Sequence, residues 1–414
     1  MLDNASRGLT FESPPECGAS TTEQLFAGLA CGRLPLDIAA VRFSVSEYFR
    51  NLTAVFVSQY EQEIDRLGSG ILPVLQAIPS TDDDIFDLCW DPSFGSLLAA
   101  VQHPDRPELP RRISGILLRL AEVGFAMSCD VSLDGEADLR IGKYLLADVV
   151  SLSVRSADGA AEVRWKTRLG ESGELNFDQG ELKFGTSVRK LNEVTGPDPS
   201  WLILDPKLVA TTEYRGNHTN YDQKPPGQFS RQCNLALSLI ERHSPSYLPW
   251  VQAVIRCLVP LHSENSGNLL GGSVKTAPGT IHITHSPDAV DIADMLIHET
   301  AHQYFHIGAK LGAFTDGSDP TMCFSPFVKA DRSIDKILMT YHAFGNAALL
   351  YHVLIQDSDL YREKYLPKLR RMLEYIDVVD GYLSRTASLT PFGMSFYAGL
   401  HRQIQSERAS AGFA

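Results

Sequence analysis

Apolar residues recur at three- and four-residue spacing over several long stretches of the chain, which predicts a mainly helical protein. Helices are expected from Ser44 to Leu67, from Arg112 to Met127, from Gln228 to His243 and from Ser246 to Leu258. Between residues 140 and 205 the period changes to two, with glycine-containing turns between the alternating runs. We therefore expect an α+β fold that is mainly helical, with a small antiparallel sheet in the middle.

The same pattern divides the chain into four regions. Residues 1–20 are unpatterned and predict a flexible tail, and residues 21–140 predict a helical N-terminal region. Residues 141–205 form the small β region, and residues 206–414 form the metal-binding catalytic region with its metal helix. At the start of the last region, residues 207–230 are rich in glycine and proline, which indicates a long irregular loop; such loops are uncommon unless they cover something.

Composition and charge narrow the class of partner. The chain is 44% hydrophobic and 21% charged, and its net charge of -13 argues against binding nucleic acid or an anionic membrane surface. No stretch approaches the length of uninterrupted apolar residues that a membrane span needs. The N-terminus is polar, and the seven cysteines form no C-x-x-C pair. These features predict a cytoplasmic enzyme.

The motif His298-Glu299-Thr300-Ala301-His302 indicates a metal-binding site. Residues four apart lie on one face of an α-helix, so the two imidazoles can bind the same metal ion, with the glutamate beside them. Ser286-Pro287-Asp288 supplies a helix start, and Gly308 offers a stop. Residues 279–284 predict a strand immediately before this helix. In zinc peptidases that order of elements accompanies a strand whose free edge pairs with an extended substrate.

A third metal ligand is expected from elsewhere in the chain. His306 would lie about 12 Å from His298 along a continuous helix, too far for one ion to bridge. His342 is the preferred candidate, because it lies in the middle of a predicted helix between the small residues Ala343 and Gly345. Weaker substitutes are His352, Glu363 and Glu374. Three nitrogen ligands suit zinc at least as well as iron.

Several further segments, taken in order, resemble a known family. They are Trp90-Asp91-Pro92, Leu235-Ala236-Leu237 leading to His243, Val259-Pro260-Leu261, residues 273–284, residues 296–302, Ser325-Pro326-Phe327 with Asp331-Arg332, and Tyr341-His342-Ala343-Phe344. From the early helices to about residue 355 the chain resembles the HExxH-motif peptide-modification family. These proteins belong to bacterial pathways for ribosomally synthesised, post-translationally modified peptides.

The resemblance implies an iron(II)- and 2-oxoglutarate-dependent dioxygenase that hydroxylates the β-carbon of a residue in a precursor peptide. It implies iron(II) at His298, His302 and His342, with 2-oxoglutarate and dioxygen as co-substrates. Arg332 matches the position expected to bind the far carboxylate of 2-oxoglutarate. Lys329 is the fallback, because this chain has Val328-Lys329 where other members place an arginine beside the Ser-Pro-aromatic unit. Glu299 would orient a metal ligand or a bound water.

Two other functions remain open at this point. A zinc metallopeptidase that processes a peptide would use Glu299 as the general base acting on zinc-bound water. An inactive, metal-stabilised peptide-binding protein would leave that glutamate without a chemical role.

Overall fold

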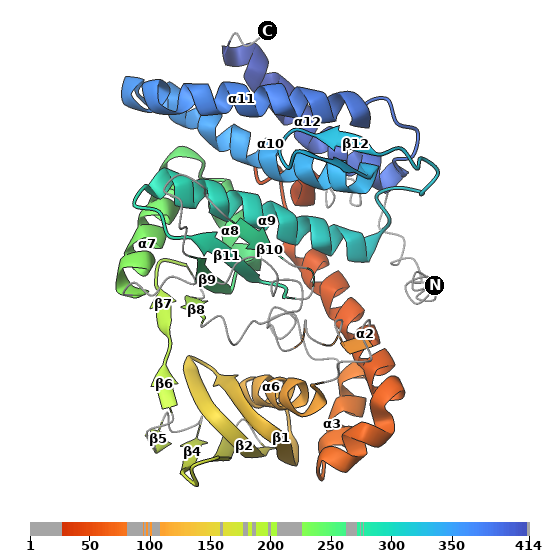
Figure 1. Cartoon of the computed structure of the whole chain (residues 1–414), viewed down its shortest axis with the longest axis vertical. Helices are drawn as coiled ribbons and strands as arrows, with labels where there is room; N and C mark the ends of the chain where they lie inside the picture. The colour runs from red at the N-terminus through yellow and green to blue at the C-terminus, as the bar shows by residue number, and fades with distance from the viewer. Residues whose placement is uncertain are drawn as a thin grey trace.

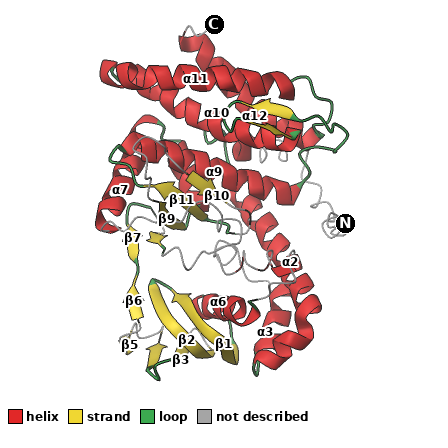
Figure 2. Cartoon of the chain, viewed as in Figure 1, coloured by secondary structure: helices red, strands yellow, loops and turns green. Residues whose placement is uncertain are grey.

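The computed structural model describes residues 27–80, 108–157, 160–176, 181–183, 188–197, 200–204, 226–261, 271–273 and 277–411, with isolated positions between them. The predicted tail, the Trp90-Asp91-Pro92 segment and most of the predicted loop lie outside the described residues. The predicted α+β, mainly helical fold class is confirmed (Figure 2). Among the described residues, no helix combines the length and the apolar character needed to cross a membrane.

An antiparallel sheet forms the lower part of the molecule in Figure 1. Its strands run in the order β1-β2-β3-β4-β5, and β6 also pairs with β2. Their bounds are β1 (Met127–Ile141), β2 (Tyr144–Ala157), β3 (Ala160–Thr167), β4 (Ser172–Asn176), β5 (Glu181–Lys183) and β6 (Val188–Lys190). One face packs against α6 (Leu109–Glu122), and β1 also contacts α2 (Ile38–Leu67) and α3 (Ile71–Ala77), which continues into the short helix η1 (Ile78–Ser80).

The start of this sheet differs from the prediction. The helix expected to reach Met127 ends at Glu122, and β1 begins at Met127 rather than at residue 141. β1 carries polar residues on its outward side, such as Asp130 and Ser132, while Cys129 and Val131 are buried. Alternation of this kind is typical of a sheet with one solvated face.

A second, mixed sheet supports the metal helix. Its strands run in the order β10-β11-β9-β8-β7, and β9 is parallel to both β8 and β11. Their bounds are β7 (Asn192–Val194), β8 (Trp201–Ile203), β9 (Cys257–Leu261), β10 (Gly271–Ser273) and β11 (Thr280–Thr284). Two helices precede β9, namely α7 (Pro226–His243) and α8 (Tyr247–Val254). Leu258, expected at the end of a helix, therefore lies in a strand.

Four long helices complete the fold in the upper part of Figure 1. They are α9 (Ala289–Leu311), α10 (Ile334–Asp357), α11 (Asp359–Leu383) and α12 (Pro391–Ala411), and a short hairpin of β12 (Cys323–Ser325) and β13 (Ala330–Arg332) precedes α10. α9 lies between the mixed sheet and α10, and it contacts α7, α8, β10 and β11 as well. This position explains why apolar residues occur nearly all around α9.

Buried aromatic residues tie the N-terminal segment to the catalytic part. The Trp250 ring stacks on Tyr304 of α9 with centroids 4.6 Å apart. The indole N–H of Trp250 donates to the carbonyl of Gly28 at 3.0 Å, and the Tyr304 hydroxyl donates to the carbonyl of Trp250 at 2.9 Å. Contacts with α8, and through α8 with residues near the start of the described chain, thus hold α9 in its orientation.

Candidate metal centre

The helix that carries the motif begins where the sequence predicts. The Asp288 carboxylate accepts from the backbone N–H of Val290 at 2.9 Å and caps the first turn of α9. The helix does not stop at Gly308 but continues to Leu311. Gly308 is needed for close packing instead, since a Cβ there would lie 2.7 Å from Cζ of Phe314.

His298, Glu299 and His302 form one cluster on α9. Their ligand atoms all lie within 4.8 Å of one another, and the two imidazole rings are nearly perpendicular, with centroids 4.8 Å apart. Glu299 is only 3% exposed, whereas the two histidines are partly accessible. Oε2 of Glu299 and Nδ1 of His302 are buried without any hydrogen-bond partner. Buried polar atoms usually have a partner, and a bound metal ion would satisfy this carboxylate and this imidazole.

The protonation of the cluster suits a cation. Burial raises the pKa of Glu299 well above its usual range, and the negative charge of Asp294 adds to the effect. Burial lowers the pKa of His302 well below its usual range, and the neighbouring imidazole of His298 lowers it further. The pKa of His298 is also lowered by burial, against an opposing effect of Asp294. Both imidazoles are therefore neutral, and their lone pairs are available to bind a metal ion.

These donors fit a transition metal ion. Two imidazoles and one carboxylate match iron(II) or zinc and not the all-oxygen environment of calcium or magnesium. His298 and His302 would bind such an ion, with Glu299 beside it.

The edge strand β10 lies against Glu299. A Cβ placed on Gly271 would come within 2.2 Å of Oε1 of Glu299, so only a glycine fits there without movement of the carboxylate. Gln303 holds this strand on the helix: its amide N–H₂ donates to Ser273 Oγ and, at 3.3 Å, to the carbonyl of Thr280. Its carbonyl oxygen accepts from Gly279 N at 3.0 Å. The strand expected to offer the free edge, residues 279–284, is instead the interior strand β11, whose five residues are all buried.

Aromatic residues close one side of the cluster. Phe344 of α10 contacts the His298 ring edge-on with centroids 4.6 Å apart. Phe327, in the turn between β12 and β13, stacks on Phe344 at 3.7 Å. The predicted Ser-Pro-Phe unit thus lies beside the metal motif, and it contributes an apolar wall.

A polar network that the sequence did not reveal lies one turn before His298. Oδ2 of Asp294 accepts from the Tyr351 hydroxyl at 2.8 Å and from Nζ of Lys368 at 2.9 Å. Asp294 and His298 have helical i,i+4 spacing, which is visible in the sequence. Their partners come from α10 and α11 and could not be identified from local spacing.

His342 does not join the cluster. Its ring is 1% exposed, and Nε2 lies 3.2 Å from the carbonyl oxygen of Leu29. Among the described aromatic residues, Phe396 of α12 lies nearest to this ring, at 4.5 Å between centroids. The imidazole lies against α9 all the same, because the backbone of Ala301 in the motif is hydrogen-bonded to it and its centroid is 6.5 Å from that of Phe305, but its ring nitrogens are engaged by backbone groups and not by the cluster. The expected third ligand is therefore a hydrogen-bonded core histidine in this structure.

The substitutes for His342 also lie elsewhere. Nδ1 of His352 is 2.7 Å from a carboxylate oxygen of Glu407 on α12. Glu363 and Glu374 line a hollow of about 590 Å³ along α11. Among the residues that the structure describes, the metal-ligand cluster contains only His298, Glu299 and His302.

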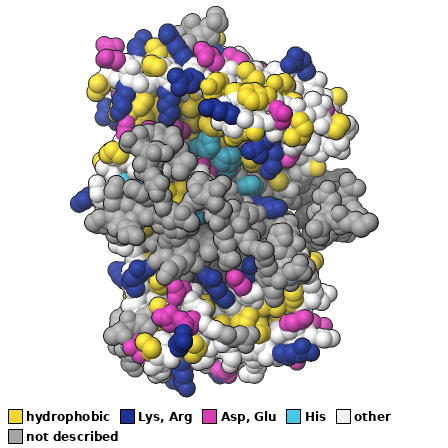
Figure 3. All heavy atoms as spheres, viewed as in Figure 1, with side chains coloured by type: hydrophobic (Ala, Val, Ile, Leu, Met, Phe, Trp, Pro, Cys, Tyr) yellow, Lys and Arg dark blue, Asp and Glu magenta, His cyan; other side chains and the backbone are white. Residues whose placement is uncertain are grey.

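Arg332 and Lys329 lie on the β12–β13 hairpin, and both side chains are exposed. Within the described part of the chain, no hydrogen bond, ion pair or ring contact joins either residue to the cluster. Their assignment to the co-substrate remains a prediction. In Figure 3, histidine side chains appear near the middle of the visible face, with lysine or arginine side chains beside them.

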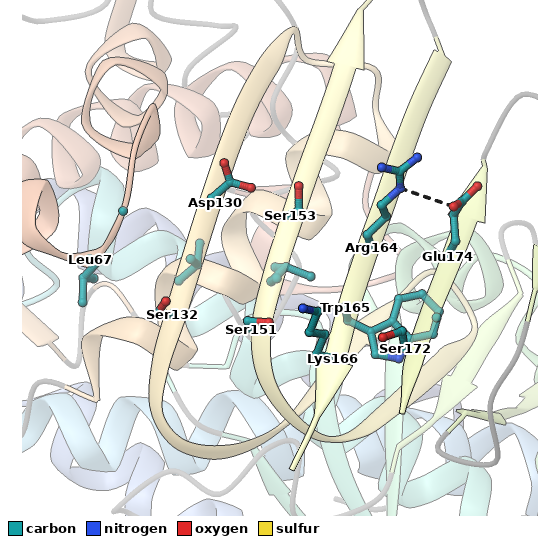
Figure 4. Close-up of a pocket in the computed structure, with 14 residues that line it drawn as sticks. Leu67, Asp130, Ser132, Ser151, Ser153, Arg164, Trp165, Lys166, Ser172 and Glu174 are labelled. Carbon is teal, nitrogen blue, oxygen red and sulfur yellow. Dashed lines mark hydrogen bonds and ion pairs between the residues drawn. The ribbon is translucent and has the colours of Figure 1, made fainter. Parts of the chain in front are cut away.

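A separate hollow of about 680 Å³ lies on the lower sheet, away from the histidines (Figure 4). Polar residues from four neighbouring strands line it in cross-strand rows, and one row is Asp130, Ser153, Arg164 and Glu174. Arg164 Nε pairs with Glu174 at 3.3 Å. Because charges of both signs alternate with small serine side chains, we interpret this hollow as part of the solvated face of the sheet.

No protein-family model matches the chain, and no curated protein matches it. The family resemblance therefore rests on the sequence segments alone and stays a hypothesis.

Proposed function

We propose that this protein is a metal-dependent enzyme that modifies a peptide, and that it acts as an iron(II)- and 2-oxoglutarate-dependent peptide β-hydroxylase. The proposed substrate is a ribosomally synthesised precursor peptide of a natural-product pathway. The observation that carries the proposal is the cluster of His298, Glu299 and His302, with two buried atoms that have no partner. Two histidines and one carboxylate, with the remaining positions open, are the ligand set of many oxygen-activating iron enzymes.

The bound metal would supply the oxidising chemistry, while the protein orients the reactants and excludes water. Neutral imidazoles at His298 and His302 would hold the ion by their lone pairs. Asp294 is anchored by Tyr351 and Lys368 and stabilises the turn of α9 that precedes His298. The stacked rings of Phe327 and Phe344 keep one side of the site apolar, which limits access of water to His298.

The edge of the mixed sheet supports a peptide as the substrate. β10 is the terminal strand of this sheet in the described part of the chain, so its outer side is available for an extended segment. Gly271 and Gly272 have no side chains to block the approach of another backbone. Gln303 holds the strand on the metal helix, so a paired peptide would pass directly beside Glu299.

A zinc metallopeptidase is the second candidate, and the position of Glu299 favours it. This carboxylate is buried between the histidines and the edge strand, where a general base for zinc-bound water would act. In that case the third protein ligand would have to come from residues outside the described cluster.

One experiment separates the two functions. Purified protein is loaded with iron(II) or zinc, and peptide mixtures are assayed by mass spectrometry for a gain of one oxygen or for cleavage, with and without 2-oxoglutarate. The hydroxylase proposal expects oxygen gain and succinate formation only with iron(II) and 2-oxoglutarate. Cleavage with zinc and no 2-oxoglutarate would refute it. Metal binding and peptide binding without either reaction would indicate an inactive binding protein.

Variants at Glu299 sharpen the comparison. In a peptidase, Glu299→Gln removes the general base and reduces the rate by about 10²–10⁴-fold. In the hydroxylase, Glu299→Gln keeps an oxygen donor beside the ion, so measurable turnover is expected at a weaker metal affinity. Glu363→Gln on α11 is the matched control, because that residue lies outside the cluster. His302→Ala should abolish metal binding and turnover in either case.

A further inference from the structure

The two ends of the metal cluster differ in charge. On the N-terminal side, the Lys368 ammonium is paired with Asp294. On the C-terminal side, one turn beyond His302, the charged side chains that act on the His306 imidazole are all lysines: Lys310, Lys336 and Lys275. One turn of helix is about 6 Å, so this basic end lies directly beside the metal ligands.

The position of Lys336 follows from the packing of α9 and α10. Tyr351 contacts Asp294, and Phe344 contacts His298, so the two helices run antiparallel. Lys336 lies two turns before Phe344, and His306 lies two turns after His298, which places them opposite each other. Lys336 accordingly lowers the pKa of both His302 and His306.

The other two lysines approach His306 from different elements. Lys310 is the next residue along the same face of α9, with Nζ 3.4 Å from the carbonyl oxygen of His306 and 5.2 Å from the centroid of the Tyr48 ring. Lys275 follows β10 by two residues, and the backbone of Ser273 in that strand is hydrogen-bonded to His306. Burial and these three positive charges lower the pKa of His306 to about 3.

Lys275 and Lys336 are exposed, and neither has an acidic partner among the residues that the structure describes. Like charges gathered beside a site that binds a cation oppose both each other and the metal. A bound anion would offset that repulsion, and a carboxylate is the anion that a peptide-modifying reaction with 2-oxoglutarate supplies.

We propose that Lys275 and Lys336, supported by Lys310, bind a carboxylate whose molecule reaches the metal cluster at its other end. The inference rests on the proposed function. It assigns the role predicted for Arg332 or Lys329 to Lys275 just after β10, Lys310 on α9 and Lys336 on α10. The carboxylate comes from 2-oxoglutarate or from the peptide, and the probes below distinguish these two sources.

The test measures binding and not turnover. Protein loaded with zinc or cobalt is titrated calorimetrically with 2-oxoglutarate and with 2-oxobutyrate, which keeps the chelating end but lacks the distal carboxylate. A second pair of probes is one ten-residue peptide with a free C-terminal carboxylate and the same peptide as its amide. Metal content is measured for the wild type and for every variant. A wild-type protein that binds no metal would refute the proposed function, whereas weaker carboxylate binding at full metal content bears on this inference alone.

Lys275→Ala and Lys336→Ala are each expected to weaken binding of one carboxylate probe by about 10- to 100-fold, since charge-assisted hydrogen bonds are lost. The matching probe without the carboxylate should be unaffected, and Lys336→Arg should retain most of the affinity. Lys166→Ala, an exposed lysine on the lower sheet, is the control. The inference is overturned if neither lysine variant changes the binding of either carboxylate probe. It is also overturned if Arg332→Ala alone abolishes that binding.

Discussion

Replacing Gly271 by alanine tests whether the edge strand fixes the position of Glu299. The new Cβ would lie 2.2 Å from Oε1 and 3.0 Å from Cδ of that side chain. Because the obstructed atoms are the far end of a flexible side chain, the carboxylate is expected to rotate away and the backbone to stay in place.

The expected cost in stability is small. An off-rotamer side chain costs about 0.5–1.5 kcal/mol. Removing a glycine restricts the unfolded chain and returns about 0.4–1 kcal/mol. The free energy of unfolding of Gly271→Ala should therefore change by less than about 1 kcal/mol, whereas a displaced group in a metal site typically lowers metal affinity by about 10–100-fold.

Metal titration followed by cobalt absorption, together with urea denaturation of the metal-free protein, gives both quantities. Gly135→Ala is the matched control, because a Cβ on this strand glycine meets nothing within 4 Å. The double variant Gly271→Ala with Glu299→Ala should be no weaker in metal affinity than Glu299→Ala alone. Undiminished metal affinity in Gly271→Ala would show that Glu299 does not contribute from the position described.

Two further predictions concern buried histidines. His342→Ala should leave metal stoichiometry unchanged and lower the free energy of unfolding by about 1–3 kcal/mol, because the buried carbonyl of Leu29 loses its partner; loss of metal in this variant would restore His342 as a ligand. Stability of the metal-free protein should fall with pH below the ordinary histidine pKa of 6.5, because His306 and His342 have folded-state pKa values lowered to about 3, so the unfolded chain binds more protons over this window. Each imidazole contributes up to about 1.4 kcal/mol per pH unit between these values, and urea midpoints that do not change between pH 7.5 and pH 5.5 would contradict the assignment.

The local features of the fold were predictable from the sequence. Periodicity and capping residues placed most of α2, α7 and the start of α9, because such signals lie within a few residues of one another. Pairing between distant segments was not predictable in the same way. β7 and β8 appeared to belong with the middle strands, but β8 pairs in parallel with β9, which lies more than fifty residues later.

The candidate site shows the same division. His298, Glu299 and His302 lie within five consecutive residues, so helix geometry alone brings them together. The third ligand depended on which face of α10 meets α9, and neighbouring small residues could not decide this. His342 and Phe344 are two positions apart on α10, and only the packed structure shows that Phe344 contacts the His298 ring while His342 is hydrogen-bonded to backbone groups such as the carbonyl of Leu29.

Whether Glu299 is a metal ligand or a general base determines how many protein ligands the metal ion has. If Glu299 binds the ion with His298 and His302, the protein supplies three donors and leaves room for a chelating co-substrate, but that carboxylate can no longer act as a general base. If Glu299 is a base, only two protein donors remain among the described residues, and two rarely hold zinc in a catalytic site. The described cluster therefore supplies three donors only if Glu299 is a ligand, and it is one ligand short for either function if Glu299 is not. Metal stoichiometry of Glu299→Gln measured beside its activity decides between them, because a ligand and a base lose different properties.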